Sequence, residues 1–185
     1  MPRPNRPRKP ATPAQVISAR RSSLALRRDY RDLLTRLVLI ALVAWLAFSQ
    51  VFLLMQNRGQ DMFPAVKDGD LVIAYRLQKD YEKDDLVVYQ RDGQHYVGRL
   101  IARAGDYVNI TEDGTLLVNG TTQAGEILYP TYPKENIVYP YAVPDGTVFI
   151  LADYRTQAQD SRDFGPVETK DIEAKVLSIL RRRGL

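Results

Sequence analysis

The side chains best suited to chemistry lie in two short stretches that are far apart in the chain. The first is Gly59-Gln60-Asp61-Met62-Phe63-Pro64, which follows an apolar span, and the second contains Asp153, Asp160 and Ser161. Two carboxylates that share one proton activate water in aspartic proteases, so Asp61 with Asp153 or Asp160 is one conceivable catalytic pair. Such a pair needs its carboxyl groups about 3 Å apart in a symmetric cradle, and nothing in the sequence indicates one.

Other catalytic groups are scarce. Ser161 and Ser178 are the only serines after residue 56, and His95 is the sole histidine. A nucleophilic serine needs an oriented base, and none is identified, so Ser161 is interpreted as a structural hydroxyl beside Arg162. Strand alternation directs His95 away from the face that holds Gly98, so His95 is interpreted as a surface residue near a turn.

Cysteine is absent, which excludes a thiolate nucleophile, a disulfide framework and a cysteine-based zinc site. The sequence contains neither a metal-binding cluster nor a glycine-rich phosphate loop, so we expect no metal and no cofactor. A chain of 185 residues with 45% hydrophobic content can bury one modest core. We therefore expect one globular domain with appendages.

The elements that must position these groups begin with a membrane anchor. Residues 37–55 carry no formal charge, and a helix of this length spans about 28 Å, close to the thickness of a bilayer core. We predict a transmembrane helix over 37–56, an uncleaved anchor rather than a signal peptide. Several arginines precede it, namely Arg27, Arg28, Arg31 and Arg36. The positive-inside rule then predicts a cytoplasmic N-terminus, a single pass through the cell membrane and an extracytoplasmic C-terminal domain.

Charge is segregated along the chain. Residues 1–36 carry a net charge of +8 and the remainder carries −4. We predict that residues 1–36 form a basic, largely disordered cytoplasmic arm that can contact anionic lipid. The arm lacks the aromatic residues that stack on bases, so nucleic-acid binding is not expected.

The sequence pattern of residues 57–185 predicts a mainly β, antiparallel domain. Short runs rich in β-branched and aromatic residues alternate with Asp-Gly, Asn-Gly and Pro turns. The predicted strands cover Leu71–Tyr75, Leu86–Tyr89, Tyr96–Ala102, Tyr107–Ile110, Leu116–Val118 and Thr147–Ala152. Residues 121–146 contain several prolines and four tyrosines, which indicates an irregular excursion.

Four motifs follow the anchor in a fixed order. They are Met62-Phe63-Pro64 to Val72, Tyr96 to Val108, Val118-Asn119-Gly120, and Asp160 to Val167. Over residues 37–180 this order resembles bacterial type I signal peptidase, peptidase family S26. The resemblance implies a signal-peptidase-like β domain preceded by one transmembrane helix.

The resemblance also implies a Ser/Lys dyad, in which a desolvated lysine takes the proton of a serine hydroxyl. The serine is expected immediately before Met-x-Pro and the lysine between Tyr-Val and Arg, where this chain has Asp61 and Gly98. The position of the supporting serine is Ala158. On this basis the sequence predicts a chain that is not an enzyme. Asp153, Asp160, Ser161 and Arg162 are expected to form the scaffold of the last motif.

What remains is a peptide-binding groove, expected to include Asp61, Met62, Pro64, Tyr96 and Gly98. Asp and Gly at the dyad positions resemble signal-peptidase-like proteins of Gram-positive pilus gene clusters. The resemblance implies a non-proteolytic assembly factor for sortase-dependent pili, with pilin subunits and a pilus sortase as partners. Two alternatives are an active signal peptidase that uses Ser161 or Asp61, and a regulator that shields signal peptides or the true peptidase.

Overall fold

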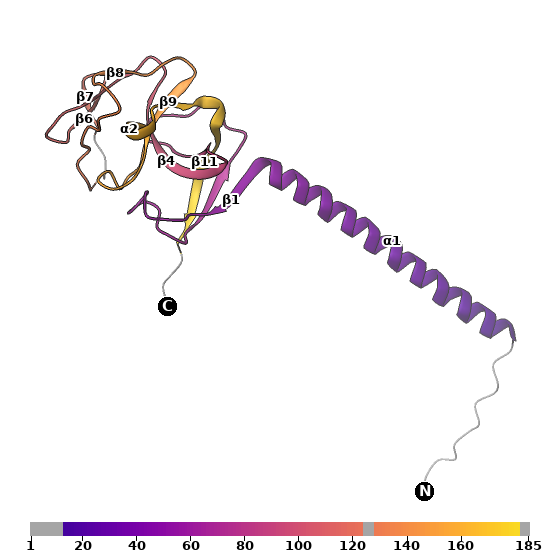
Figure 1. The fold of residues 1–185 in the computed structure, drawn as a ribbon. Coiled ribbons are helices and arrows are strands. Elements are labelled where there is room, and N and C mark those ends of the chain that lie inside the picture. Colours follow the sequence, from indigo (N-terminus) through magenta and orange to yellow (C-terminus); the bar gives the residue numbers. More distant parts are fainter. Residues whose placement is uncertain (1–12, 124–127, 182–185) are drawn as a thin grey trace, which may run out of the picture. The chain divides into compact units, whose positions relative to one another are not determined.

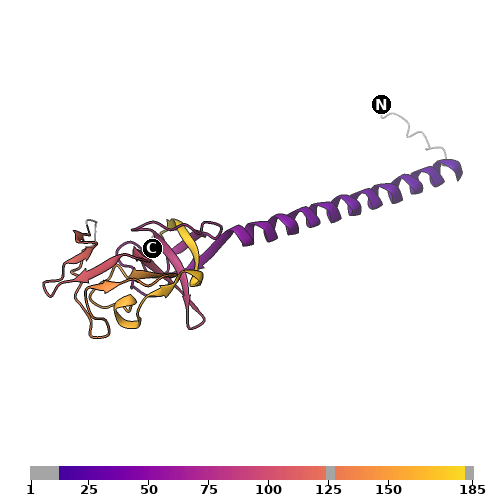
Figure 2. The same ribbon diagram turned by 90° about the horizontal axis from the view of Figure 1, so that it is seen from above.

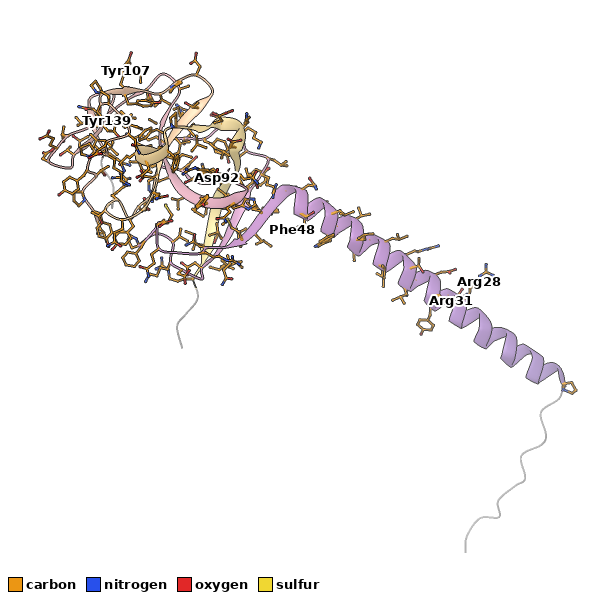
Figure 3. All side chains as sticks on the ribbon, viewed as in Figure 1. Arg28, Arg31, Phe48, Asp92, Tyr107 and Tyr139 are labelled. Atoms are coloured by element: carbon orange, nitrogen blue, oxygen red, sulfur yellow. The ribbon has the colours of Figure 1, made fainter. Side chains whose placement is uncertain are left out.

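The computed structural model describes residues 13–123 and 128–181. The chain forms two compact units, Met1–Phe48 and Ser49–Leu185. Helix α1 covers Pro13–Val51 and is continuous in both views of Figures 1 and 2. Figure 3 shows Arg28 and Arg31 on this helix, where a 24-residue stretch, Arg28–Val51, is long and apolar enough to cross a membrane.

The bounds of α1 differ from the predicted ones. The helix begins at Pro13, so residues 13–36 are helical where a disordered arm was expected, while residues 1–12 lie outside the described part of the chain. Alanine, leucine and arginine are good helix formers, which favours extension of the apolar helix toward the N-terminus. At its other end the helix stops at Val51, and the following residues pair as a strand instead of continuing to residue 56.

The second unit is mainly antiparallel β, as predicted. Its strands are β1 (Phe52–Gln56), β2 (Leu71–Tyr75), β3 (Leu86–Arg91), β4 (Gln94–Arg103), β5 (Tyr107–Ile110), β6 (Leu116–Val118), β7 (Thr121–Thr122), β8 (Tyr141–Ala142), β9 (Thr147–Leu151), β10 (Val167–Glu168) and β11 (Ile172–Leu180). A short helix α2 covers Ser161–Phe164, and a 3-10 turn η1 covers Thr169–Asp171.

These strands form two sheets. The larger has the order β1-β2-β11-β3-β4-β9-β10 and the smaller has the order β7-β6-β5-β8. Figure 1 shows β6, β7 and β8 gathered on one side of this unit, apart from β1, β4 and β11. Two tight hairpins set the registers: Asp92-Gly93 between β3 and β4, and Asn119-Gly120 between β6 and β7. All four turn residues have positive φ, as a type I′ turn requires.

Alternation along β4 divides the core. Val97 packs with Met62, Ala152 and Ala158 in one apolar cluster. On the opposite face of β4, Tyr96 and Leu100 belong to a second apolar cluster, which also contains Tyr89, Ile150 and Phe164. A third cluster joins Ile101 and Phe149 to the smaller sheet. Because successive strand side chains point to opposite faces, β4 connects both sides of the larger sheet.

The end of β9 is fastened to α2 by a buried ion pair. Asp160 and Arg162 are each 1% exposed, and Arg162 Nη2 lies 2.8 Å from Asp160 Oδ2. The Asp160 carboxylate also accepts hydrogen bonds from the backbone N–H groups of Ala152 and Arg162. Arg162 donates in addition to the carbonyl oxygens of Tyr132 and Arg155. The pair thus joins a strand end, a helix and two loops.

We predict that Asp160→Asn lowers the free energy of unfolding by about 3–5 kcal/mol, since it leaves the buried Arg162 guanidinium without its counter-charge. The full chain in detergent would be unfolded with urea and followed by the near-ultraviolet circular dichroism of its 11 tyrosines. Asp145→Asn, at an exposed position, is the control and is expected to change stability by less than about 0.5 kcal/mol. Equal losses in the free energy of unfolding for the two substitutions would contradict a stabilising role of the Asp160–Arg162 pair.

Candidate functional site: a groove beside Asp61

The segment that carries Asp61 is held by its backbone. Asp61 O accepts a hydrogen bond from Tyr154 N at 2.9 Å, and Val66 N donates to Met62 O at 2.8 Å. Met62 and Val66 are buried in the core, whereas Asp61 remains exposed. The core side chains that follow Asp61 therefore anchor the loop, while Asp61 itself stays exposed to solvent.

Beside this loop, strand β4 has a half-free edge. Residues Gln94–Arg99 pair with β3 on one side, but on the other side the ladder with β9 begins only at Arg99. Among the described strands, none pairs with Gln94–Gly98 on that second side. Gln94 and His95 are exposed and Tyr96 is half-buried, whereas Val97 and Gly98 are buried, so the accessible part of this edge is its beginning.

Two cavities flank Asp61 at this edge. The larger, about 420 Å³, is lined by Met55, Gln56, Asn57, Arg58, Asp61, Met62, Gln94, His95, Tyr96 and Val97. The smaller, about 250 Å³, is lined by Asp61, Tyr89, Arg91, Tyr96, Gln157, Gln159 and Phe164. Asp61 and Tyr96 border both cavities, which together form what we call the Asp61 groove.

Gly98 is packed too closely to carry a side chain in this structure. A Cβ atom there would lie 2.4 Å from Cγ2 of Ile150 and 3.1 Å from Cε1 of Tyr89. Real Cβ atoms essentially never approach other heavy atoms so closely, and the Ile150 methyl sits on a branched carbon that cannot swing aside without a backbone or rotamer change. The volume that a side chain at position 98 would occupy is filled by Ile150 and Tyr89.

Aromatic rings form one wall of the smaller cavity. Tyr89 and Tyr96 face each other across the β3–β4 pair and stack with centroids 5.8 Å apart. The Arg91 guanidinium lies over the Phe164 ring at 3.8 Å, and Arg91 Nε is 3.4 Å from Asp92 in the adjoining turn, which Figure 3 labels. Burial raises the pKa of Tyr89, so its hydroxyl remains protonated at neutral pH.

The carboxyl of Asp61 is electrostatically disfavoured as an anion. Its pKa is raised, first because the surrounding protein removes part of its hydration and second because the negative charge of Asp160 repels it. Within the described residues, no hydrogen bond or ion pair joins this carboxyl to a cation or donor. The aspartic pair of Asp61 with Asp160 is not supported, since Asp160 is buried and bonded to Arg162.

The residues of the last motif lie beneath the groove. Ser161 is 0% exposed and its Oγ accepts a hydrogen bond from Ile150 N at 3.0 Å. Asp153 forms a two-point pair with Arg99, at 2.8 and 2.6 Å. Ala158 is buried in the cluster that contains Met62. Ser161 therefore has no access to a bound peptide in this structure.

Some predicted groove residues line the cavities and others do not. Asp61, Met62 and Tyr96 do, whereas Pro64 and Gly98 are not among the residues that line the two described cavities. His95 is exposed near a turn, as expected, and its ring forms a hydrogen bond with Glu173 at 3.0 Å. It also borders the larger cavity with Asp61, which alternation alone did not predict.

Sequence reasoning missed Tyr89, Arg91, Gln157, Gln159 and Phe164. Of these, only Tyr89 had a sequence signal, since the Asp92-Gly93 hairpin places it opposite Tyr96. The described part of the chain contains no group of three His, Cys, Asp or Glu side chains suited to a metal ion.

Comparison with known proteins gives the class. Residues 30–180 match the sequence model of the family described as signal peptidase, peptidase S26. The chain therefore belongs to the signal peptidase family S26.

Individual relatives agree with this class. The chain is 33% identical over 124 residues to "Probable thylakoidal processing peptidase 2, chloroplastic" of Arabidopsis thaliana, covering 60% of this chain and 33% of that protein. It is 29% identical over 128 residues to "Signal peptidase I" of Bacillus licheniformis, covering 62% and 68% of the two chains. With "Signal peptidase I" of Bacillus caldolyticus the identity is 31% over 134 residues, covering 64% and 73%. This chain thus spans about one third of the Arabidopsis relative.

The prediction that the chain is not an enzyme is contradicted by these comparisons. It depended on two dyad positions carried over from a resemblance, whereas the relatives found by alignment are named as signal peptidases and processing peptidases. The assignment of Asp61, Gly98 and Ala158 to the positions of the dyad and its supporting serine stays a prediction.

We expect Gly98→Ala to destabilise the protein by about 1–3 kcal/mol through overpacking against Ile150. Ile150→Ala alone should cost about 2–5 kcal/mol, because it opens a cavity. The double variant should cost less than the sum of the two, since each change relieves the other. The double-mutant cycle is measured by urea unfolding of the wild type, the two single variants and the double variant. Strict additivity would show that Ile150 does not occupy the space beside Gly98.

Asp61→Asn should stabilise the protein at pH 7, by less than about 1 kcal/mol because the group is exposed. The pKa of Asp61 is raised in the folded state, so its contribution to stability is most favourable below the ordinary value of 3.8. That contribution decreases as the pH rises through the raised pKa. Asparagine mimics the neutral form, so the gain should vanish near pH 3. Unfolding midpoints of both proteins between pH 3 and 7 test this, and a gain independent of pH would contradict it.

Proposed function

We propose that this protein holds an extended segment of an exported protein in the Asp61 groove. The observation that carries the proposal is the unpaired edge of β4, Gln94–Gly98, which lies beside Asp61 with a cavity on either side. An extended peptide that adds to a strand edge gains main-chain hydrogen bonds, and pockets for its alternate side chains provide selectivity.

The placement of the two cavities fits that mode of binding. Val97 and His95, on one face of β4, line the larger cavity and not the smaller, whereas Tyr96, on the other face, borders both. A peptide strand along this edge would direct successive side chains alternately to the two cavities, because side chains in a strand have a period of two residues.

The membrane anchor supports a substrate or partner that is itself at the membrane. The apolar stretch Arg28–Val51 fits a membrane anchor. We propose a single pass with the N-terminus in the cytoplasm and the β domain outside, following the basic residues on the leading side of the span.

For the identity of the exported protein, we propose pilin subunits, with a pilus sortase as a further partner. This rests on the resemblance of Asp61 and Gly98 to the residues of signal-peptidase-like proteins in Gram-positive pilus gene clusters. The packing of Gly98 against Ile150 and Tyr89 supports a groove adapted to glycine at that position.

A second candidate function is cleavage of signal peptides. The names of the relatives favour it. Of the two groups considered for such a role, the exposed Asp61 is accessible from the groove, whereas Ser161 is buried and its hydroxyl is bonded to the backbone.

The test uses the full-length chain in detergent with two membrane-embedded probes, a preprotein and a pilin precursor. We expect the amide protons of Gln94–Gly98 that do not bond to β3 to be protected from hydrogen exchange when the pilin precursor is added. Cleavage of the preprotein is measured in parallel for wild type, Asp61→Ala and the control Asp145→Ala.

The outcomes separate the candidates. Protection by the pilin precursor supports the assembly role, while preprotein cleavage that Asp61→Ala abolishes and Asp145→Ala leaves intact supports the peptidase role. If neither probe protects Gln94–Gly98 and neither is cleaved, the groove does not bind exported segments and the proposal fails.

A further inference from the structure

The carboxyl of Asp61 is a charged group in a groove without a described counter-charge. It is exposed at the boundary of both cavities. Among the described residues, the charge that acts on it is that of Asp160, which has the same sign and is already paired with Arg162. An unpaired, partly desolvated carboxylate is a strong acceptor for a charged donor, because charge-assisted hydrogen bonds are about twice as strong as neutral ones.

Three of the four neighbouring cationic or basic side chains are engaged elsewhere. Arg91 lies over the Phe164 ring and next to Asp92. His95 bonds to Glu173, which also lies 3.5 Å from Arg76. Arg99 donates to the Asp153 carboxylate and to the carbonyl oxygen of Asp84. Arg58 borders the larger cavity but forms no described ion pair with Asp61. Within the described residues no cation pairs with the Asp61 carboxyl, so a cationic group of a ligand would meet an uncompensated carboxylate there.

The walls of the smaller cavity suit a cation. The stacked rings of Tyr89 and Tyr96 offer aromatic surface, and cations are attracted to such faces. Gln157 and Gln159 border the same cavity with carboxamide groups, whose oxygens accept hydrogen bonds. The Arg91 guanidinium over Phe164 shows that this wall already accommodates one cation on an aromatic face.

We infer that the smaller cavity receives a lysine or arginine side chain of the bound peptide, and that its charged end pairs with Asp61. This inference rests on the proposed peptide-binding function and specifies its ligand. The residues before and after the cationic one would then face the larger cavity, since side chains alternate along a strand. The groove would accordingly select extended segments with a basic residue at one position.

Binding of a cation should depend on pH in a defined direction. The raised pKa of Asp61 means that its carboxyl becomes neutral at a higher pH than an ordinary aspartate. The preference for a basic residue should be complete at pH 7 and decrease as the pH falls through that raised pKa. The other charged or titratable groups that line the groove are Tyr89, Tyr96, Arg91, Arg58 and His95, and the buried Asp160 acts on Asp61 through its charge. The variant Asp61→Asn separates the contribution of Asp61 from theirs.

The test measures binding of four decapeptides to the full chain in detergent micelles. The peptides alternate Ala and Thr, are acetylated and amidated to remove terminal charges, and carry Lys, Arg, norleucine or Glu at the fifth position. Binding is followed by the amide resonances of Gln94–Gly98. We expect the Lys and Arg peptides to bind about tenfold more tightly than the norleucine peptide at pH 7, as a charge-assisted contact implies.

Asp61→Asn should abolish this preference without abolishing binding of the norleucine peptide, and Asp145→Asn should leave it unchanged. Equal affinities for Lys and norleucine, or tighter binding of Glu, would overturn the inference while leaving the groove intact. If none of the four peptides perturbs Gln94–Gly98, both the inference and the proposed function fail.

Discussion

The ion pair between Asp160 and Arg162 is the contact on which the rest of the site depends. Both groups are almost wholly removed from water, so each is tolerated only because it compensates the other and because backbone groups use its remaining hydrogen-bonding capacity. The pair fixes the chain just after β9, where Gln157 and Gln159 border the smaller cavity and where Tyr154 holds the loop of Asp61. The same carboxylate also raises the pKa of Asp61. One buried pair thus holds a segment that borders the groove and adds to the pKa shift of Asp61, which is caused first by loss of hydration and second by the charge of Asp160.

The groove exists because the larger sheet is interrupted. Strand β4 is longer than the part of β9 that pairs with it, and the Asp61 loop occupies the region where β9 no longer pairs. Unpaired edges are usually short or covered, because they invite unwanted pairing. Here the edge is bounded by a loop and two cavities. Under the proposed function, this arrangement admits an extended segment and makes the unpaired edge a binding surface.

Membership of the signal peptidase family and the local structure of the site provide different information. The family match covers residues 30–180 and defines the class of protein. The chemistry of the groove depends on its own side chains and on how closely they pack. Ile150 and Tyr89 fill the space beside Gly98. The hydroxyl of Ser161 accepts a hydrogen bond from the backbone of β9. Asp61 is the exposed carboxyl that borders both cavities of the groove.

Local sequence patterns determined much of the β domain. Predicted strands Leu71–Tyr75, Tyr107–Ile110 and Leu116–Val118 have the same bounds in the structure, because alternating apolar residues and residues able to adopt positive φ act locally. The long strand β11 was not predicted, since Glu, Ala and Lys do not favour strands and its partners β2 and β3 are distant in sequence. Strand β1 was missed because it continues an apolar run, whose periodicity does not distinguish helix from strand.

The motifs also located Asp61, Met62 and Tyr96 from the sequence alone. Only the tertiary structure placed Gln157, Gln159 and Phe164 beside them, and only packing between β4 and β9 revealed that Ile150 closes the space at Gly98. The physical reason is the range of the interactions. Turn conformation and strand alternation depend on neighbouring residues, whereas a cavity and the electrostatic state of its carboxyl depend on side chains brought together from separate parts of the chain.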